Sequence, residues 1–589
     1  MSGFLVLARH RDDAGAFVAA VASLAPMLEA SDWKCVWSGD RAVALVRRAR
    51  ELATRPIIRD LGMVVGDLFP RHDSVAPLQM GADAAAFERQ CRRLSADHWG
   101  RYVAVRWPTE NTVAAVFRDP SGGLDCLSWA AAGVTVVSSN LPPDLPATLR
   151  PKLSLDWDAI GGLVFDPNRA ADALALTGAR ALWPGEIWYD DPTLAPIQVW
   201  TPKVFTAPTS RPDDELQREL VGRVDACVSA WLPAASGALI EVSGGLDSAI
   251  VATSAAKLET LGPRVWLNYR ASNPRGDERR FARAVSAVGG FELTETAMPL
   301  APLDLDAWRT LSSSVRPPLS ALALHRDQDL AARCAADELS RVVTGEGGDL
   351  VFFQAPTALV LADLVQSGAT PLAVLRATHQ VARWSGHSAW RCLFRALGAG
   401  RRQAFASQER GPWPALTERA VQCATSSPHP WLEAIDHLPP AKRLQIEALA
   451  ACQSLNGDSH VARSAVVVHP LLSQPVVELC LQIPTFQLTR CRRDRAFARE
   501  AFSARLPPEV THRRAKGEVS SHSGRVLASS LDVLRPLLMD GELARHGLLD
   551  RAQLETLLTP ESLIVGGNFY ALASTALVET WVSGWVSRL

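Results

Sequence analysis

A short apolar segment followed at once by two glycines narrows the possible folds of this chain. Residues 238–242 (ALIEV) have the composition of a buried strand, and residues 243–248 (SGGLDS) lead from it into a helical pattern that stops at Gly262. Glycines let phosphate oxygens approach the backbone, and free N–H groups at the start of a helix favour negative charge. The sequence therefore predicts a pyrophosphate-binding turn between a strand and a helix.

The segments around this turn predict a parallel sheet. Apolar runs of strand length at residues 264–269 and 341–344 alternate with helical patterns, including one at residues 329–339. This alternation is typical of a parallel sheet that helices cover on both faces. From about residue 355 onward the pattern is mostly helical, so we expect an α/β domain with a helical C-terminal region.

The first 200 or so residues follow a different pattern. Short alternating segments, for example residues 102–107, 112–117 and 133–137, are separated by Gly, Pro, Asp and Asn, and they predict a β-rich domain. A Pro- and Thr-rich stretch then precedes the next helical pattern. We place the domain boundary inside that stretch, which gives domains at residues 1–205 and 206–589.

Bulk composition limits the partners and the compartment. Lys plus Arg total 61 and Asp plus Glu total 62, so no overall field attracts nucleic acid or an anionic membrane, and partner arguments must be local. The ten cysteines are scattered without a CxxC pair, which is typical of the reducing cytoplasm. No segment predicts a membrane span or a signal peptide. We expect a cytoplasmic protein without nucleic-acid or membrane partners.

Two glycine-rich segments resemble those of one enzyme family. The SGGLDS turn resembles the pyrophosphatase loop of enzymes that cleave ATP to AMP and pyrophosphate, among them asparagine, GMP and argininosuccinate synthetases. Residues 344–349 (TGEGGD) resemble the Ser-Gly-Glu-Gly-Ala-Asp segment of asparagine synthetases, which narrows the resemblance to that family. The resemblance implies ATP contacts at Val242, Ser243, Gly244, Gly245, Leu246, Asp247, Ser248, Thr344 and Gly345.

Three carboxylates in these segments have implied roles. Asp247 would repel a polyphosphate unless a Mg²⁺ ion lay between them, so we interpret it as a metal ligand. The resemblance implies that Asp349 is the second Mg²⁺ ligand and that Glu346 lies beside the acyl-adenylate. An attacking amine must lose a proton, and Glu346 is our candidate for the general base that accepts it.

A basic run near the C-terminus contains a predicted transition-state cation. Residues 506–510 (LPPEV) and 513–517 (RRAKG) resemble the family run in which a Leu-Pro segment precedes an Arg-x-x-Lys or Arg-x-Lys element. The resemblance implies that Lys516 contacts the ATP phosphates. One fixed cation there would contribute about 3 kcal/mol to stabilising the transition state. The alternative for this run is a merely solvated basic surface.

The N-terminal half carries landmarks that resemble the glutaminase domain of asparagine synthetases. They are residues 117–122 (FRDPSG), 138–140 (SSN) and 178–185, so the resemblance covers nearly the whole chain. It implies an Ntn-type, glutaminase-like β-rich sandwich at the N-terminus. It also implies an adenine-nucleotide α-hydrolase-like parallel sheet in the C-terminal domain.

The catalytic residue of such a glutaminase is missing from the sequence. Glutaminases of this type use an N-terminal cysteine that their own α-amine activates. Here the second residue is Ser2, and no cysteine occurs before Cys35. We expect a degenerate glutaminase-like domain without glutaminase activity.

A second departure concerns the substrate. Residues 466–473 (VVVHPLLS) occupy the place of Glu-Ala-Arg-Val-Pro-Phe-Leu-Asp in asparagine synthetases, so valines replace a charged pair and free aspartate is disfavoured as substrate. Two branches of the family dispense with glutamine, namely β-lactam synthetases and the macrolactam synthetases of lasso peptides. The EGGD variant, the HPLL segment and the tail with residues 568–570 (NFY) resemble lasso cyclases, whereas β-lactam synthetases typically have Tyr in place of Glu346.

The resemblance implies ATP-dependent ring closure in a lasso-type peptide. An Asp or Glu side chain would be adenylated and attacked by the N-terminal amine, with release of AMP and pyrophosphate. Expected partners are a precursor or core peptide, a leader peptidase and a leader-binding protein. The alternatives are an ammonia-dependent asparagine synthetase, a β-lactam synthetase, and a nucleotide-binding scaffold for a precursor peptide.

Overall fold

The computed structural model describes most of the 589 residues. The described residues are 3–10, 14–30, 32–47, 57–72, 80–171, 174–234, 236–259, 262–271, 273, 276–398, 413–423, 429–514, 517, 520–565 and 568–589.

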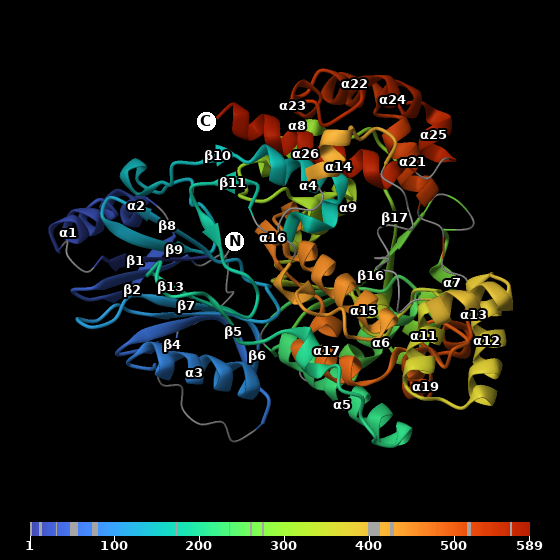
Figure 1. Ribbon diagram of the computed structural model, residues 1–589. Coiled ribbons are helices and arrows are strands. Elements are labelled where there is room, and N and C mark those ends of the chain that lie inside the picture. Colours follow the sequence, from blue (N-terminus) through green and yellow to red (C-terminus); the bar gives the residue numbers. More distant parts are fainter. Residues whose placement is uncertain are drawn as a thin grey trace.

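The N-terminal half is a sandwich of two antiparallel sheets (Figure 1). The first has the order β12-β8-β9-β1-β3-β2, with β1 Gly3–Arg9, β2 Trp33–Ser38, β3 Ala42–Arg47, β8 Leu127–Ala131, β9 Val134–Ser138 and β12 Arg180–Ala181. The second has the order β14-β13-β7-β6-β5-β4, with β4 Ile57–Arg59, β5 Gly62–Pro70, β6 His98–Arg106, β7 Ala115–Arg118, β13 Glu186–Tyr189 and β14 Ile197–Gln198. The predicted β-rich N-terminal domain is therefore confirmed.

Alternation along the strands explains how the sandwich is filled. In β1, Phe4 and Val6 belong to the core between the two sheets, where they meet residues such as Val105 of β6. Leu5 and Leu7 point to the opposite face, which belongs to a second core. Successive side chains of a strand point to opposite faces, and here both faces are covered, so the whole run is buried.

The C-terminal half contains the predicted parallel sheet, in the order β17-β16-β15-β18-β19. Its strands are β15 Ala238–Glu241, β16 Arg264–Arg270, β17 Leu293–Ala297, β18 Arg341–Val343 and β19 Val466–Val468, and every neighbouring pair is parallel. The sequence did not identify β19, because three residues are too few for a periodic signal. The predicted fold class, mixed α/β with a β-rich N-terminal part and a parallel sheet with helices, is confirmed.

Helices cover both faces of this sheet. On one face, Ile240 of β15 packs with helices α5 Asp213–Trp231, α6 Leu246–Ala256 and α7 Arg279–Gly289. On the other, Leu239 packs with α9 Leu324–Ala336 and α16 His460–Ser464. Strand β15 is central, and its two neighbours, β16 and β18, both follow it in the chain and lie on opposite sides of it. Loops after β15 and β18 therefore meet at the carboxyl edge of the sheet, where ligands bind in such folds.

The two halves share buried contacts. Arg71, after β5, donates two hydrogen bonds to Glu478 of α17 Gln474–Gln482, at 2.6 and 3.0 Å, and Trp200 Nε1 donates to the same carboxylate at 2.9 Å. The last helix, α26 Phe569–Val586, is buried on nearly all sides in the core that also holds Leu5 and Leu7. The predicted boundary at 205/206 stays a prediction. Among the described residues, no helix is long and apolar enough to cross a membrane.

Candidate active site

The turn after β15 contains two glycines, Gly244 and Gly245, and the structure explains the absence of a side chain differently at each position. Gly244 has φ +82°, and a Cβ there would lie 2.9 Å from the Glu278 carbonyl oxygen and 3.0 Å from Phe281 Cβ, so both backbone and packing require glycine. Gly245 has φ −80°, and a Cβ there would meet only Ser243 Oγ, at 3.4 Å. Nothing in the protein demands glycine at position 245. The open space beside it, at the start of α6, fits the close approach of a phosphate.

Two serine hydroxyls hold this turn closed. Ser243 N–H donates to Ser248 Oγ at 3.1 Å, and the two hydroxyl oxygens lie 2.9 Å apart. Gly245 N–H donates to Ser243 Oγ at 3.3 Å. The turn is therefore shaped by its own side chains before any ligand binds.

The second loop packs directly on the first. A Cβ on Gly345 would lie 2.3 Å from the Ser248 backbone nitrogen, and one on Gly348 would lie 2.7 Å from Asp247 Cγ. Such distances leave no room for any side chain. The glycines therefore let the start of α10, Gly348–Val351, approach Asp247, and this brings together two segments that are about a hundred residues apart in the chain.

The carboxylates of Asp247 and Asp349 both stabilise the positive charge of the same buried side chain, that of Arg495. Arg495 forms an ion pair with Asp247 Oδ2 and binds Asp494 Oδ2 through Nε at 2.9 Å. Burial would lower the pKa of the Arg495 guanidinium, but the carboxylates of Asp247, Asp494 and Asp349 outweigh it and raise that pKa. No sequence motif pointed to this role of Arg495.

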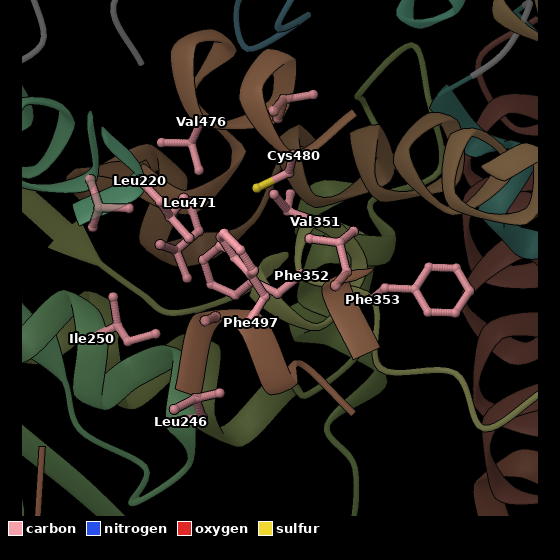
Figure 2. Close-up of a cluster of buried hydrophobic side chains, with 14 of the residues drawn as sticks. Leu220, Leu246, Ile250, Val351, Phe352, Phe353, Leu471, Val476, Cys480 and Phe497 are labelled. Carbon is pink, nitrogen blue, oxygen red and sulfur yellow. The ribbon is translucent and has the colours of Figure 1, made fainter. Parts of the chain in front are cut away.

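A buried hydrophobic cluster anchors the chain segments that carry these charged groups. Figure 2 shows Leu246, Val351 and Phe497 converging in one buried cluster. Leu246 precedes Asp247, Val351 follows Asp349 by two residues, and Phe497 follows Arg495 by two residues. Each charged side chain is therefore held close to a buried anchor, which limits its movement.

The pair of carboxylates fits a Mg²⁺ site of a particular kind. Among the described residues, no group of three or more His, Cys, Asp or Glu side chains could hold a metal by itself. Two carboxylates are what Mg²⁺ needs from a protein when phosphates and water supply the remaining ligands.

Glu346 projects toward a cluster of polar side chains. Its backbone N–H donates to Thr344 Oγ1 at 3.1 Å, and that hydroxyl lies 2.7 Å from His469 Nδ1. Its carboxylate lies 3.7 Å from the Arg326 guanidinium and 4.0 Å from His469 Nδ1, with 40% of the side chain exposed. Burial lowers the pKa of His469, so its ring is neutral at pH 7.

A buried ion pair that the sequence analysis missed supports Glu346. Arg326 donates through Nε to Glu241 Oε1 at 3.0 Å and also pairs with Glu241 Oε2. Burial and the nearby Glu346 raise the pKa of Glu241, and Arg326 opposes that rise. A glutamate inside the apolar run ALIEV is itself a signal, because a buried carboxylate needs a partner.

Lys516 lies outside the described residues, so its predicted role is not tested. Residues on both sides of it contact Glu278, the residue before α7: Gly517 N–H donates to Glu278 Oε1 at 2.6 Å, and Arg513 pairs with the same oxygen. Arg513 also donates to the Gly244 carbonyl at 3.2 Å. The basic run therefore reaches the glycine-rich turn through Arg513.

One large cavity adjoins all these groups. Its volume is about 2210 Å³, and residues of both halves line it. The C-terminal half contributes Asp247, Glu346 and Asp349, together with Val466, Val467 and His469 from β19 and the residue after it. The N-terminal sandwich contributes Phe4, Arg47, Arg101 and Asn140 to the same cavity.

The geometry brings the predicted residues together in one place. The end of β15 and the turn after it contain Val242, Ser243, Gly244, Gly245, Leu246, Asp247 and Ser248. The loop packed on this turn contains Thr344, Gly345, Glu346 and Asp349. Their assignment to ATP and Mg²⁺ remains a prediction.

Comparison with known proteins identifies the family. The model of the asparagine synthase family matches residues 220–583, which is more than half of the chain. The chain therefore belongs to the asparagine synthase family. This family consists of ATP-dependent ligases that form amide bonds. A search of curated proteins found no match.

Two of the solved structures that match this chain have low sequence identity to it. One is described as the structure of the allosteric regulatory enzyme of purine biosynthesis, with 14% identity, a TM-score of 0.20, and coverage of 51% of this chain and 82% of that one. The other is glutamine phosphoribosylpyrophosphate amidotransferase from B. subtilis complexed with ADP and GMP, with 13% identity, a TM-score of 0.20, and coverage of 51% and 83%. At these scores neither structure adds an argument about this chain.

Proposed function

We propose that this asparagine synthase family member closes a macrolactam ring in a lasso-type peptide. It would adenylate an Asp or Glu side chain of the peptide, and the N-terminal amine of the same peptide would then form the amide. AMP and pyrophosphate are the other products. The proposal includes a core peptide as substrate, and a leader peptidase and a leader-binding protein as partners.

The size of the cavity is the observation that carries this proposal. Sites for small molecules occupy about 300–1,000 Å³. The cavity beside Asp247 and Glu346 measures about 2210 Å³, which is larger than ATP and a free amino acid need. Its second wall belongs to the N-terminal sandwich, so a long substrate has a surface to lie on.

The wall beside Glu346 also favours a peptide over free aspartate. Val466 lines the cavity at the position where asparagine synthetases have the glutamate of a charged pair, and Val467 lines it beside Val466. Valine side chains cannot bind the charged α-amino and α-carboxyl groups of a free amino acid. They suit the apolar parts of a folded peptide instead.

The first chemical step would take place at the two glycine-rich loops. The substrate carboxylate attacks the α-phosphorus of ATP, and pyrophosphate leaves toward the N–H groups of the turn at residues 243–248. Asp247 and Asp349 would hold Mg²⁺, which supplies neutralisation of the polyphosphate charge. Arg495 and, by prediction, Lys516 add positive charge on the same side.

Glu346 would act in the second step. The amine nitrogen attacks the acyl carbon, AMP leaves, and the amine proton passes to the Glu346 carboxylate. The Arg326 guanidinium lies 3.7 Å from that carboxylate and offers it an opposite charge, and neutral His469 lies 4.0 Å from it. Holding amine and adenylate on one peptide makes the step unimolecular, which is worth effective concentrations of roughly 10⁵ M or more.

Mass spectrometry of a core peptide tests the proposal. The peptide is incubated with the enzyme, its peptidase and leader-binding partners, ATP and Mg²⁺. Loss of one water with formation of AMP and pyrophosphate is expected. Glu346→Gln should still release pyrophosphate but form the ring about a hundredfold more slowly or worse.

The same assay distinguishes the alternatives. If added aspartate and ammonia give asparagine while the peptide mass is unchanged, the protein is an ammonia-dependent asparagine synthetase. Ring closure in a small β-amino acid would indicate a β-lactam synthetase. Binding of ATP without any pyrophosphate release would indicate a scaffold.

A further inference from the structure

The helical hairpin of α12 Pro371–Ser385 and α13 Ala389–Gly398 has an unusual surface. It lies at the edge of the molecule, in yellow in Figure 1, and packs against α11 Leu359–Gln366. Large apolar side chains on it are more than half exposed: Leu372 56%, Leu375 66%, Trp390 71%, Phe394 70% and Leu397 60%. Monomeric proteins seldom leave so many large apolar side chains together in water.

Helix α13 is divided into separate stripes. Cys392 and Ala396 are buried and form the stripe that packs against the protein. Trp390, Phe394 and Leu397 are spaced four and three residues apart, so they share one exposed face. The exposed apolar stripe is therefore not the helix's packing face, which is already occupied.

The charge of the hairpin has one sign. Residues 371–398 contain no Asp or Glu. Arg376, Arg383 and Arg391 are exposed, and within the described part of the chain none of these three forms an ion pair. The surface combines apolar side chains with unneutralised positive charge.

An ordinary surface helix of the same protein looks different. At the start of α5, Arg211, which precedes the helix, pairs with Glu215 and Glu219, and on the helix itself Arg218 pairs with Asp214. Mixed charges of this kind are typical of a helix face that remains in water. The hairpin lacks them, which indicates that something other than water covers its face.

We propose that the α12–α13 hairpin docks on an anionic lipid surface. Trp, Phe and Leu side chains on one helix face enter the boundary between headgroups and acyl chains, and arginines beside them attract anionic headgroups. A second copy of the chain is a poor occupant, because two faces of the same positive charge repel each other. Protein interfaces usually carry both positive and negative side chains at their rims. This face carries only positive side chains, which is the sign that an anionic bilayer attracts.

This inference revises the expectation of no membrane partner. That expectation used the balanced charge of the whole chain, and the local charge of the hairpin differs from it. The hairpin would lie on the membrane and not cross it. Because Gln380, Arg383 and Trp384 of α12 also line the large cavity, docking would place that cavity beside the lipid surface.

Vesicle flotation of the full-length protein tests the proposal without any peptide substrate. We expect the protein to float with vesicles of phosphatidylglycerol and phosphatidylcholine, to float poorly with pure phosphatidylcholine vesicles, and to be released by high salt. The double variant W390S/F394S should lose roughly tenfold or more of its binding. Val288→Ser is the matched control, because Val288 is 55% exposed on helix α7 and should leave binding unchanged.

Three results would overturn the inference. They are no flotation of the wild type with anionic vesicles, equal flotation of W390S/F394S, or an equal loss in Val288→Ser. Thermal melting of each variant checks that it is folded. If W390S/F394S leaves vesicle binding unchanged but weakens binding of a purified partner protein, the face is a protein interface and the lipid proposal is wrong.

Discussion

The two halves of the molecule use buried charges in opposite ways. In the N-terminal sandwich, the buried Asp119 accepts hydrogen bonds from Tyr102 N–H at 3.0 Å, from Ser121 N–H at 2.7 Å and from the Ser121 hydroxyl. At the carboxyl edge of the parallel sheet, Asp247 and Glu346 line the cavity. Asp119 holds a loop of its own half, whereas the two carboxylates at the sheet edge are available to a substrate.

The comparison separates structural from chemical roles within one chain. A buried charge whose partners all belong to its own half and that does not line the cavity should affect folding when it is removed. A charge that faces the cavity should affect the reaction when it is removed. Four predictions test this separation.

The largest effect is expected for Asp247→Asn. The variant keeps the shape of the side chain but loses the charge, so pyrophosphate release should fall by about a thousandfold. Asp119→Asn is the matched variant in the sandwich. It should lower the melting temperature and leave pyrophosphate release per folded molecule unchanged. Equal loss of activity in both variants would contradict the separation.

The pair Glu241–Arg326 combines features of structural charges and of charges that face the cavity, because it is buried and also adjoins Glu346. Arg326→Gln leaves the Glu241 carboxylate buried without its cation and should lower the free energy of unfolding by about 3 kcal/mol. The double variant E241Q/R326Q should recover much of that stability, as measured by urea denaturation. No recovery in the double variant would mean that the pair is not coupled.

His429 tests how the halves are joined, because its ring lies 4.9 Å from Trp183 of the sandwich and 4.9 Å from Trp431. Burial lowers the pKa of His429 from 6.5 to about 4. As the pH falls, the unfolded chain therefore binds this proton before the folded one does, and stability is lost between about pH 6.5 and about pH 4.

This loss should amount to about 2 kcal/mol between pH 7 and pH 4.5. Urea denaturation at a series of pH values measures it. His429→Gln should flatten that part of the profile, and an unchanged slope would show that other groups cause it.

The smallest effect separates two glycines of the site. Gly245→Ala should leave stability nearly unchanged, because its Cβ meets only Ser243 Oγ at 3.4 Å, but should raise the KM for ATP about tenfold by obstructing the phosphate. Gly345→Ala should destabilise the fold, because its Cβ would lie 2.3 Å from Ser248 N. Isothermal denaturation and steady-state kinetics on both variants check this. An unchanged KM in Gly245→Ala would place the phosphates elsewhere.

Local motifs made part of the site predictable from the sequence. Residues 243–248 and 344–349 each follow a strand, and neighbouring parallel strands end at one edge, so their meeting followed from the sheet. The contacts of Arg495 with Asp247 and of Arg326 with Glu241 join segments 248 and 85 residues apart. No local pattern encodes such pairs, because they depend on how helices pack over the sheet.

Only part of the surface character of the α12–α13 hairpin could be predicted from the sequence. The absence of acidic residues from 371–398 can be read directly. Which apolar side chains are exposed cannot, because Cys392 and Phe394 are both apolar and only packing against α11 decides which one faces water.

The cavity with walls from two halves has a consequence for how such an enzyme can diversify. In the loops around Asp247, a Cβ on Gly244, Gly345 or Gly348 would lie within 3.0 Å of neighbouring atoms, so substitution of these glycines destabilises the fold. Arg47 and Asn140 line the opposite wall and belong to a domain with its own core. Mutation of that wall can therefore change the accepted substrate while the nucleotide chemistry is inherited intact, which makes the sandwich the natural target for directed evolution.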